Sequence, residues 1–193
     1  MLNDNSEKSD MDQLGTSNDG KSDSNGCWGC KKGCNFCKFY LKQSKIAYSY
    51  HTNSVFKINS NIDCNSENVV YIINNKTTKV SSVGCTSNCT RERFRNHKSH
   101  IKKMIPSCEV STHIKDNWAL HALDTSTFDK YDKSLSTHLE VILIEKVEIS
   151  ADIQHCAKER LKVCKRREWY WQNQLKTLRK YGGLNIREEK SYP

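Results

Sequence analysis

A single apolar run, NVVYII (68–73), constrains the fold of this chain more than any other feature. It combines β-branched, aliphatic and aromatic residues between polar flanks, which is typical of a buried strand. The polar segment NNKTT can form a turn after it, so KVSSVG (79–84) is expected to return as a second strand. A run of similar character, HLEVILIEKVEI (138–149), predicts a further strand. The sequence therefore indicates a sheet of about three strands.

Two helices are predicted beside these strands. The segment TSN (86–88) offers N-cap residues for a helix over residues 89–104, which Pro106 ends. The apolar stripe of this helix is Phe94, Ile101 and Ile105. Ser150 is expected to cap a second helix of roughly 30 residues that stops at the glycine pair 182–183. The order hairpin, helix, strand, helix predicts a small α/β or α+β domain in which helices flank the sheet.

The net charge of +9 is distributed unevenly along the chain. Residues 1–26 hold six acidic residues against two lysines, so the rest of the chain carries +13. The tail has almost nothing to bury and is expected to be disordered. The predicted organisation is a tail over 1–26, a cysteine-rich segment over 27–66 and a folded domain over 67–190. Within that domain, residues 106–137 have no pattern that assigns them to an element.

A body this basic indicates a polyanionic partner, either nucleic acid or an acidic membrane surface, unless it is simply a soluble basic domain. No apolar run approaches the ~20 residues that span a bilayer. The first residues also lack the basic and apolar regions of a secretory signal. An intracellular location without membrane association is therefore expected. In that setting the ten cysteines favour metal binding or free thiols over disulfides.

The densest cysteine cluster is CWGCKKGCNFC (27–37), with the spacing C-x2-C-x3-C-x2-C. Each C-x2-C pair is a usual half-site for tetrahedral Zn²⁺. The three residues between the pairs are fewer than in most zinc sites. An iron–sulfur cluster, whose cysteine runs are equally compact, and simple reduced thiols remain the alternatives.

The second predicted helix carries one carboxylate on its apolar side, Glu168. It fills the gap between Cys164 and Trp171 in a stripe whose other positions follow at steps of three and four. The stripe comprises Ile153, Ala157, Leu161, Cys164, Trp171, Leu175 and Leu178. A carboxylate there is costly to desolvate. Either a nearby Lys or Arg neutralises Glu168, or it binds a hard divalent cation.

Three other residues are candidates for chemistry. Arg93 and His97 are four apart and share one face of the first helix. An Arg fork can hold phosphate oxygens, and a His can accept or relay a proton. Tyr71 lies within the first strand among aliphatic neighbours. The ordinary alternatives are solvated side chains for Arg93 and His97, and packing with one hydrogen-bond partner for Tyr71.

The order of these residues resembles the GIY-YIG nuclease family. In that family a GIY strand, a YIG strand, a helix with R-x-x-x-H, a later Glu and a distal Asn form one active site. The matching segments here are VVY (69–71), SVG (82–84), RFRNH (93–97), EWYW (168–171) and GLN (183–185). The resemblance implies a GIY-YIG-like fold and hydrolysis of a DNA phosphodiester bond.

The likeness extends to the GIY-YIG domain at the C-terminus of Penelope-like retroelements, where a cysteine cluster precedes similar segments. The corresponding segments here are CNSENVVYI (64–72), RFRNHKS (93–99) and LKTLRKYGGLN (175–185). The resemblance covers residues 27–187. It implies that DNA is the partner, that the location is nuclear, and that the parent element carries a reverse-transcriptase domain.

The family's functional residues can be carried over onto the matching positions. Tyr71 would be the general base that activates water, assisted by His97. Arg93 would stabilise the pentavalent phosphate, and Asn185 would orient the other groups. Glu168 would hold a single Mg²⁺ or Mn²⁺ ion.

The relatives also imply that Cys64 joins the zinc site. Structural Zn²⁺ is thus expected on four of five thiols, namely those of Cys27, Cys30, Cys34, Cys37 and Cys64. Basic side chains expected to contact DNA are Lys31, Lys32, Lys98, Lys102, Lys103, Arg166 and Arg167.

Two positions depart from the family pattern. Ser82 stands where the tyrosine of YIG is expected, and it is too short to reach the position of a phenol oxygen. Val69 replaces the glycine of GIY, as in the Penelope-like relatives. Three interpretations remain: a nicking endonuclease, a catalytically impaired nucleic-acid-binding module, or a truncated retroelement fragment.

Overall fold

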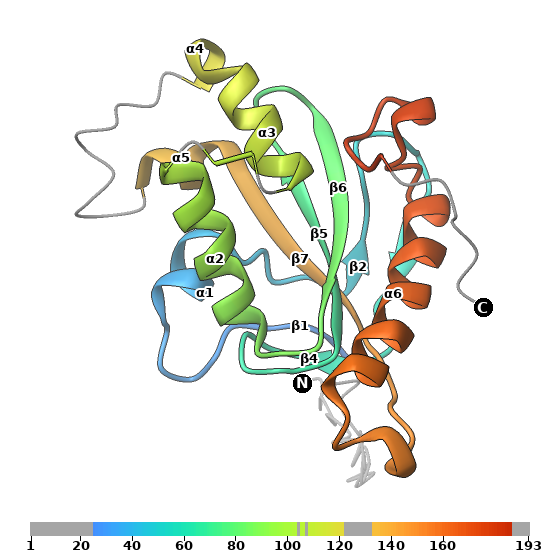
Figure 1. Ribbon diagram of the computed structural model, residues 1–193. Coiled ribbons are helices and arrows are strands. Elements are labelled where there is room, and N and C mark those ends of the chain that lie inside the picture. The colour runs from blue at the N-terminus through green and yellow to red at the C-terminus, as the bar shows by residue number, and fades with distance from the viewer. Residues whose placement is uncertain (1–24, 104, 107, 122–132, 187–193) are drawn as a thin grey trace, which may run out of the picture.

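The computed structural model describes residues 25–103, 105–106, 108–121 and 133–186 (Figure 1). Most of the predicted tail over 1–26 and the middle of the unassigned stretch over 106–137 lie outside these residues. Within them the protein combines helices with small sheets around a shared apolar core. The broad expectation of a mixed helix-and-sheet domain is therefore confirmed.

The central sheet has three strands, in the order β6-β5-β7. They are β5 (Val69–Asn75), β6 (Val80–Thr86) and β7 (Leu139–Lys146). All three strands were predicted, and both pairings are antiparallel, so the fold is α+β. Every residue of β5 is buried because this strand lies in the middle and is covered on both faces.

Helix α2 (Thr90–Lys102) lies at the predicted place and buries Phe94 and Ile101. The third residue of its predicted stripe, Ile105, is 42% exposed. The prediction for Ile105 is wrong because the helix ends at Lys102, so the 3.6-residue period no longer sets the direction of the side chain. A short helix, α3 (Glu109–Asp116), follows and packs on α2.

The predicted long helix is shorter and has a different start. Ser150 precedes a 3-10 turn, η1 (Ala151–Ile153), and α6 begins only at Ala157 and ends at Gln174. Lys176 then has a left-handed φ of 54°, which ends the helix before the glycine pair. The apolar spacing predicted one continuous helix because Leu175 and Leu178 continue its steps of three and four. Both are buried, but they lie in the segment after α6.

Further short helices are α4 (Trp118–His121) and α5 (Lys133–His138), both near one end of β7. The chain after α6 forms a 3-10 turn, η2 (Arg179–Tyr181), and returns to strand β6. The backbone N–H of Leu184 donates to the carbonyl of Ser81, at 3.0 Å. The free edge of β6 is therefore partly covered by this returning loop.

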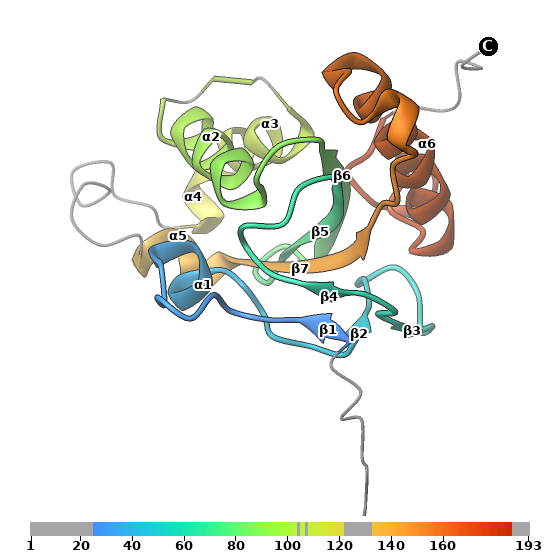
Figure 2. The ribbon, with the colours of Figure 1, turned by 90° about the horizontal axis from the view of Figure 1, so that it is seen from below.

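The cysteine-rich segment packs along β7 (Figure 2) and also contacts α2, since the rings of Phe36 and Tyr40 lie 5.0 and 4.6 Å from that of Phe94. It contains a short helix and four two-residue strands, namely β1 (Gly26–Cys27), α1 (Asn35–Phe39), β2 (Ile46–Ala47), β3 (Phe56–Lys57) and β4 (Asn61–Ile62). The N–H of Lys42 donates to the carbonyl of Val141, and the N–H of Val141 donates to that of Tyr40, both at 2.8 Å. The segment thus continues the sheet beyond β7.

Candidate active site and candidate metal centre

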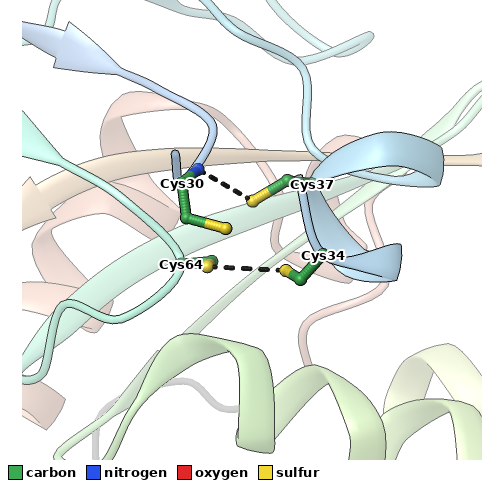
Figure 3. Close-up of side chains that lie close together, drawn as sticks. All are labelled: Cys30, Cys34, Cys37 and Cys64. Atoms are coloured by element: carbon green, nitrogen blue, oxygen red, sulfur yellow. Dashed lines mark hydrogen bonds between the residues drawn. The ribbon is translucent and has the colours of Figure 1, made fainter. Parts of the chain in front are cut away.

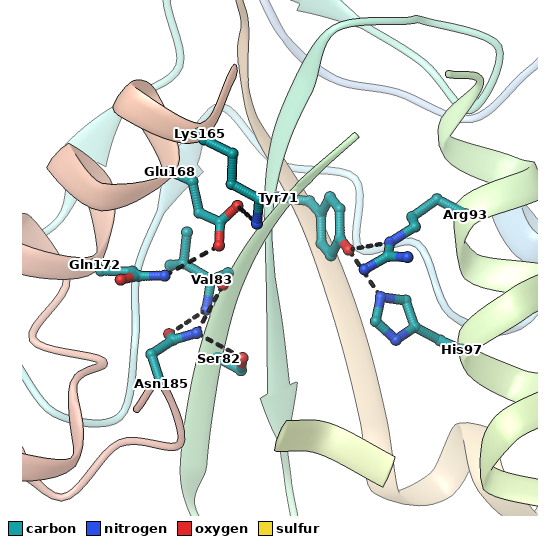
Figure 4. A network of polar contacts seen from close by, with 9 residues as sticks. All are labelled: Tyr71, Ser82, Val83, Arg93, His97, Lys165, Glu168, Gln172 and Asn185. Carbon is teal, nitrogen blue, oxygen red and sulfur yellow. Dashed lines mark hydrogen bonds and ion pairs between the residues drawn. The ribbon is translucent and has the colours of Figure 1, made fainter. Parts of the chain in front are cut away.

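A cleft of about 420 Å³ lies between α6 and the pair α2 and α3, and strand β6 passes between these walls (Figure 4). Because side chains alternate along a strand, Ser82 and Gly84 face one side of β6. Val83 and Cys85 face the other side. All four line the cleft, so it extends over both faces of this edge strand.

Tyr71 on β5 is the centre of a hydrogen-bonded group on the α2 side of the cleft (Figure 4). Its hydroxyl lies 2.8 Å from Nε2 of His97 and accepts a 3.1 Å hydrogen bond from Nε of Arg93. Tyr71 is 3% exposed and His97 is 6% exposed. The ordinary alternatives therefore do not describe this group: His97 is not solvated, and Tyr71 has two polar partners.

Burial makes the uncharged forms of Tyr71 and His97 the stable ones at neutral pH. It raises the pKa of the Tyr71 phenol above its usual range, although the charge of Arg93 opposes this rise. Burial also lowers the pKa of His97 to about 3, and the charge of Arg93 adds to the effect. Since Arg93 donates to the phenol oxygen, the phenol hydrogen is available for the neutral ring nitrogen of His97.

Cys108 holds the other nitrogen of His97, a contact that no sequence pattern predicted. Its Sγ lies 3.3 Å from Nδ1 of His97, and the residue is the N-cap of α3. When Nε2 accepts from Tyr71, the ring proton resides on Nδ1 and points toward the sulfur. The chain of contacts from Cys108 through His97 to Tyr71 thus connects α3, α2 and β5.

Gly84 gives the Tyr71 ring its space. The two residues are paired across β5 and β6, and a Cβ built on Gly84 would lie 2.7 Å from the Tyr71 hydroxyl oxygen. No side chain fits there without moving the phenol. Gly84 is the last residue of the SVG segment. A glycine is required there because the Tyr71 hydroxyl fills the space that a side chain would need.

Glu168 lies on the α6 side of the cleft and is 8% exposed, as its place in the apolar stripe predicted. Its Oε2 accepts a 2.6 Å hydrogen bond from Nζ of Lys165, and its Oε1 accepts a 3.2 Å bond from Nε2 of Gln172. The carboxylate is therefore neutralised by a lysine one turn away (Figure 4). The spacings of three and four residues around Glu168 could have indicated both partners.

Asn185 binds the backbone of β6 and does not contact Tyr71, Arg93 or His97 in any hydrogen bond among the described residues. Its Oδ1 accepts from the N–H of Val83 at 2.8 Å, and its Nδ2 donates to the carbonyl of Val83 at 2.9 Å. The same Nδ2 lies 3.2 Å from Oγ of Ser82. Asn185 therefore positions the edge strand and the small side chain that replaces the expected tyrosine.

Four thiols lie together beside the sheet and form the cysteine centre, defined as Cys30, Cys34, Cys37 and Cys64 (Figure 3). All four Sγ atoms lie within 4.8 Å of one another, and those of Cys34 and Cys64 are 3.6 Å apart. Tetrahedral Zn²⁺ with Zn–S bonds of ~2.3 Å needs sulfurs about 3.8 Å apart. The cysteine centre can therefore hold a metal ion such as zinc.

The fifth predicted thiol, Cys27, lies outside the cysteine centre. It is fully buried, its Sγ accepts the N–H of Leu143 at 3.3 Å, and burial raises the pKa of its thiol to about 12. Within the centre, burial also raises the pKa of Cys37, to about 11, and that of Cys64. The backbone N–H of Cys34 lowers the pKa of Cys30 to about 6.

The predicted DNA contacts are spread over three parts of the surface. Lys31 and Lys32 are exposed on the turn between Cys30 and Cys34. Lys98, Lys102 and Lys103 lie on or just after α2, and Arg166 and Arg167 lie on α6. Of these seven, Arg167 is held at Glu145, since its Nε lies 2.9 and 3.0 Å from the two carboxylate oxygens.

Among the described residues, no helix combines the length and the apolar character that crossing a membrane requires. Comparisons of the chain with protein-family models, with curated proteins and with solved structures found no match. The chemistry of the cleft and of the cysteine centre is thus interpreted from the residues themselves.

Proposed function

We propose that this protein is a divalent-metal-dependent DNA endonuclease of the GIY-YIG type, which nicks DNA by phosphodiester hydrolysis. One observation carries the proposal: Tyr71, Arg93, His97 and Glu168 come from three elements and line a single cleft. Sequence spacing alone gives no reason for side chains from β5, α2 and α6 to share a cavity. The four types together supply an anion holder, a proton path and a cation ligand.

Arg93 would hold the scissile phosphate. Its Nε is committed to the Tyr71 hydroxyl, and the part-buried guanidinium lines the cleft beside it. A guanidinium in this position can donate to phosphate oxygens and stabilise the additional negative charge that develops during attack. The same contact fixes the phosphate next to the phenol, where the attacking water must be.

Tyr71 and His97 would move the proton of that water. The phenol hydroxyl donates to Nε2 of His97, so a water bound at the phenol oxygen can transfer a proton as the phenol passes its own to the imidazole. The low pKa of His97 opposes this transfer in the free protein. A bound phosphate anion raises the pKa of a neighbouring imidazole, so the transfer becomes easier when substrate is present.

Glu168 would hold the divalent cation, Mg²⁺ or Mn²⁺. One carboxylate with water and substrate phosphate is a common ligand set for Mg²⁺. The ammonium group 2.6 Å from Oε2 indicates that a cation is stabilised at this position. When bound, the ion would polarise the phosphate and stabilise the leaving oxygen.

In this proposal the cysteine centre is a structural zinc site that holds α1 against the segment before β5. Lysines beside it, Lys31 and Lys32, would contact DNA phosphates. The proposed setting is the nucleus, with an origin in a Penelope-like retroelement whose parent carried a reverse transcriptase. These parts are supported by the sequence resemblance and the basic charge of the chain.

A second candidate is a nucleic-acid-binding module that no longer hydrolyses DNA. Two observations favour it. Ser82 stands where a second phenol would be, and the ammonium of Lys165 is paired with the Glu168 carboxylate at which the divalent cation would bind. This candidate keeps the fold, the cysteine centre and the basic surface but has no turnover. It differs from the endonuclease in one measurable property, metal-dependent nicking.

Nicking of supercoiled plasmid in Mg²⁺ or Mn²⁺ tests the proposal. We expect Glu168→Gln and Tyr71→Phe each to reduce the rate by about 100-fold or more, since both remove a group that acts in the reaction. Glu159→Gln is the matched control, because Glu159 lies on the same helix in an exposed pair with Lys162. Salt-sensitive DNA binding without nicking, even in Ser82→Tyr, would refute the endonuclease and support the binding module.

A further inference from the structure

The geometry of the cleft points to Lys165 as an internal cation that occupies the metal position at Glu168, so that it must leave before a divalent ion binds. This inference rests on the proposed function for the identity of the ion. It adds a regulatory device to that site: the metal affinity of the free protein is held low by one of its own side chains.

The position of Lys165 is the first argument. Its Nζ lies 2.6 Å from Oε2 of Glu168, slightly closer than the about 2.7–2.9 Å that is usual for a charge-assisted N–H···O hydrogen bond. Both residues line the cleft, and the ammonium therefore occupies space in which a cation bound to the same oxygen would have to lie. An ammonium and a divalent ion repel each other at such a separation. The two cations are thus alternatives.

Of the two partners in this ion pair, Lys165 is the one that can move. The side chain of Lys165 is 32% exposed and ends in a flexible four-carbon stem, whereas that of Glu168 is 11% exposed. Gln172 holds the second oxygen of Glu168 from the next turn of α6, at 3.2 Å. Exchange therefore proceeds by movement of the lysine toward solvent while the carboxylate stays in place.

A neighbouring ion pair, between Arg167 of α6 and Glu145, is held by more contacts than the Lys165–Glu168 pair. Arg167 contacts both oxygens of Glu145 through Nε, and the indole Nε1 of Trp171 also donates to Glu145. The guanidinium Nε of Arg167 and the indole of Trp171 together fix the Glu145 carboxylate by geometry, whereas a lysine acts as a point charge. Unlike the Arg167–Glu145 pair, the Lys165–Glu168 pair in the cleft has a partner suited to exchange.

The destination of Lys165 follows from its charge and its place in the cleft, and is a phosphate of the bound DNA strand. A phosphate held by Arg93 enters the same cleft and offers the ammonium an anion. Once Lys165 pairs with it, Glu168 is free for the divalent ion. DNA binding should therefore strengthen metal binding, and the metal should strengthen DNA binding by the same factor, since coupling between ligands is reciprocal.

The test measures Mn²⁺ binding directly, by the electron-paramagnetic-resonance signal of free Mn²⁺, on the full chain with its cysteine centre loaded with zinc. We expect Lys165→Met to bind Mn²⁺ at least tenfold more tightly than the wild type. Lys165→Arg keeps the charge and should not tighten binding. Lys162→Met is the matched control on the same helix, in an exposed pair with Glu159, and should match the wild type within twofold. Glu168→Gln should abolish Mn²⁺ binding both in the wild type and in Lys165→Met.

Other results would overturn the inference. Equal Mn²⁺ affinity in the wild type and in folded Lys165→Met refutes the exchange, and if that wild type still nicks DNA, the endonuclease proposal stands. Tightening by Lys165→Arg as large as by Lys165→Met shows that shape, and not charge, is responsible. Nicking in the presence of EDTA that Lys165→Met abolishes shows that the lysine replaces the metal altogether.

Discussion

In the cysteine centre four thiols face one another, whereas in the cleft each functional side chain faces a protein partner of complementary character. The Sγ atoms of Cys34 and Cys64 lie 3.6 Å apart, and all four thiols lie within 4.8 Å of one another. In contrast, Tyr71 is bonded to His97, and Glu168 to Lys165. The cysteine centre can therefore hold a metal ion such as zinc among its four thiols. The cleft is complete without one, and its ligands must displace existing contacts.

The largest expected effect concerns the cysteine centre. Structural zinc contributes about 10–16 kcal/mol of apparent binding energy in small zinc domains, and this energy is part of folding. Cys64→Ser removes the one ligand that joins α1 to the segment before β5. We expect Tm to fall by roughly 10 °C or more, measured by thermal denaturation in excess zinc.

Cys156→Ser is the matched control, since Cys156 is a partly buried thiol at the N-cap of α6 and lies outside the centre. Its Tm should change by no more than about 2 °C, because serine is also a good N-cap. The comparison between centre and cleft would be contradicted if both variants lowered Tm equally, or if purified protein with an intact centre bound no metal.

The second prediction concerns the space around Tyr71. Gly84→Ala places a methyl group 2.7 Å from the phenol oxygen, so the ring must move and its hydrogen bond to His97 is disturbed. We expect about a 100-fold loss of nicking, and a destabilisation of 1–3 kcal/mol, which is about the usual cost of overpacking. Urea denaturation and plasmid nicking measure the two effects.

Gly29→Ala provides the control for this substitution. Its added methyl group would meet the flexible side chain of Gln43 at 3.4 Å, so it should be tolerated. A Gly84→Ala protein with unchanged nicking and unchanged stability would show that the contacts of Tyr71 are adjustable. The side chains of the cleft would then not be fixed by one another in the absence of a ligand.

The two regions also differ in how far the sequence predicted them. Cys30, Cys34 and Cys37 of the cysteine centre follow from local spacing, whereas Cys64 was expected only from the family resemblance. The exclusion of Cys27 needed the structure, because its burial against β7 depends on tertiary packing. The three strands followed from β-branched runs, and α2 lies at its predicted place, although its N-cap is Cys89 and none of the predicted residues 86–88. The convergence of Tyr71 and Glu168 on one cleft was expected from a family resemblance, not from periodicity.

What the sequence did not predict depends on contacts between distant segments or on backbone geometry. The end of α6 is set by the left-handed backbone at Lys176, whereas apolar spacing continues through the following turn. Helix α3 buries Val110 and Ile114 among polar neighbours, which is too weak a period to assign. The contact of Cys108 with His97 joins residues on separate helices and leaves no trace in spacing.

The smallest expected effect tests whether His97 is uncharged in the folded protein. The pKa of His97 is lowered to about 3 in the folded protein, against about 6.5 in an unfolded chain. Below pH 6.5 the unfolded chain therefore binds a proton that the folded protein excludes, and stability falls as the pH decreases toward 3. The slope from this residue is at most about 1.4 kcal/mol per pH unit. His97→Gln should remove it.

Urea unfolding of the wild type and His97→Gln between pH 7 and pH 5 measures this difference. The pKa values of His113 and His138 are also lowered by burial, but both residues remain in the variant, so their contribution cancels. The wild type should lose up to about 2 kcal/mol more than the variant over this range. Parallel curves would mean that His97 takes up a proton in the folded state. His97 would then carry a positive charge without an acidic partner among the described residues, and the contrast with the cysteine centre would disappear.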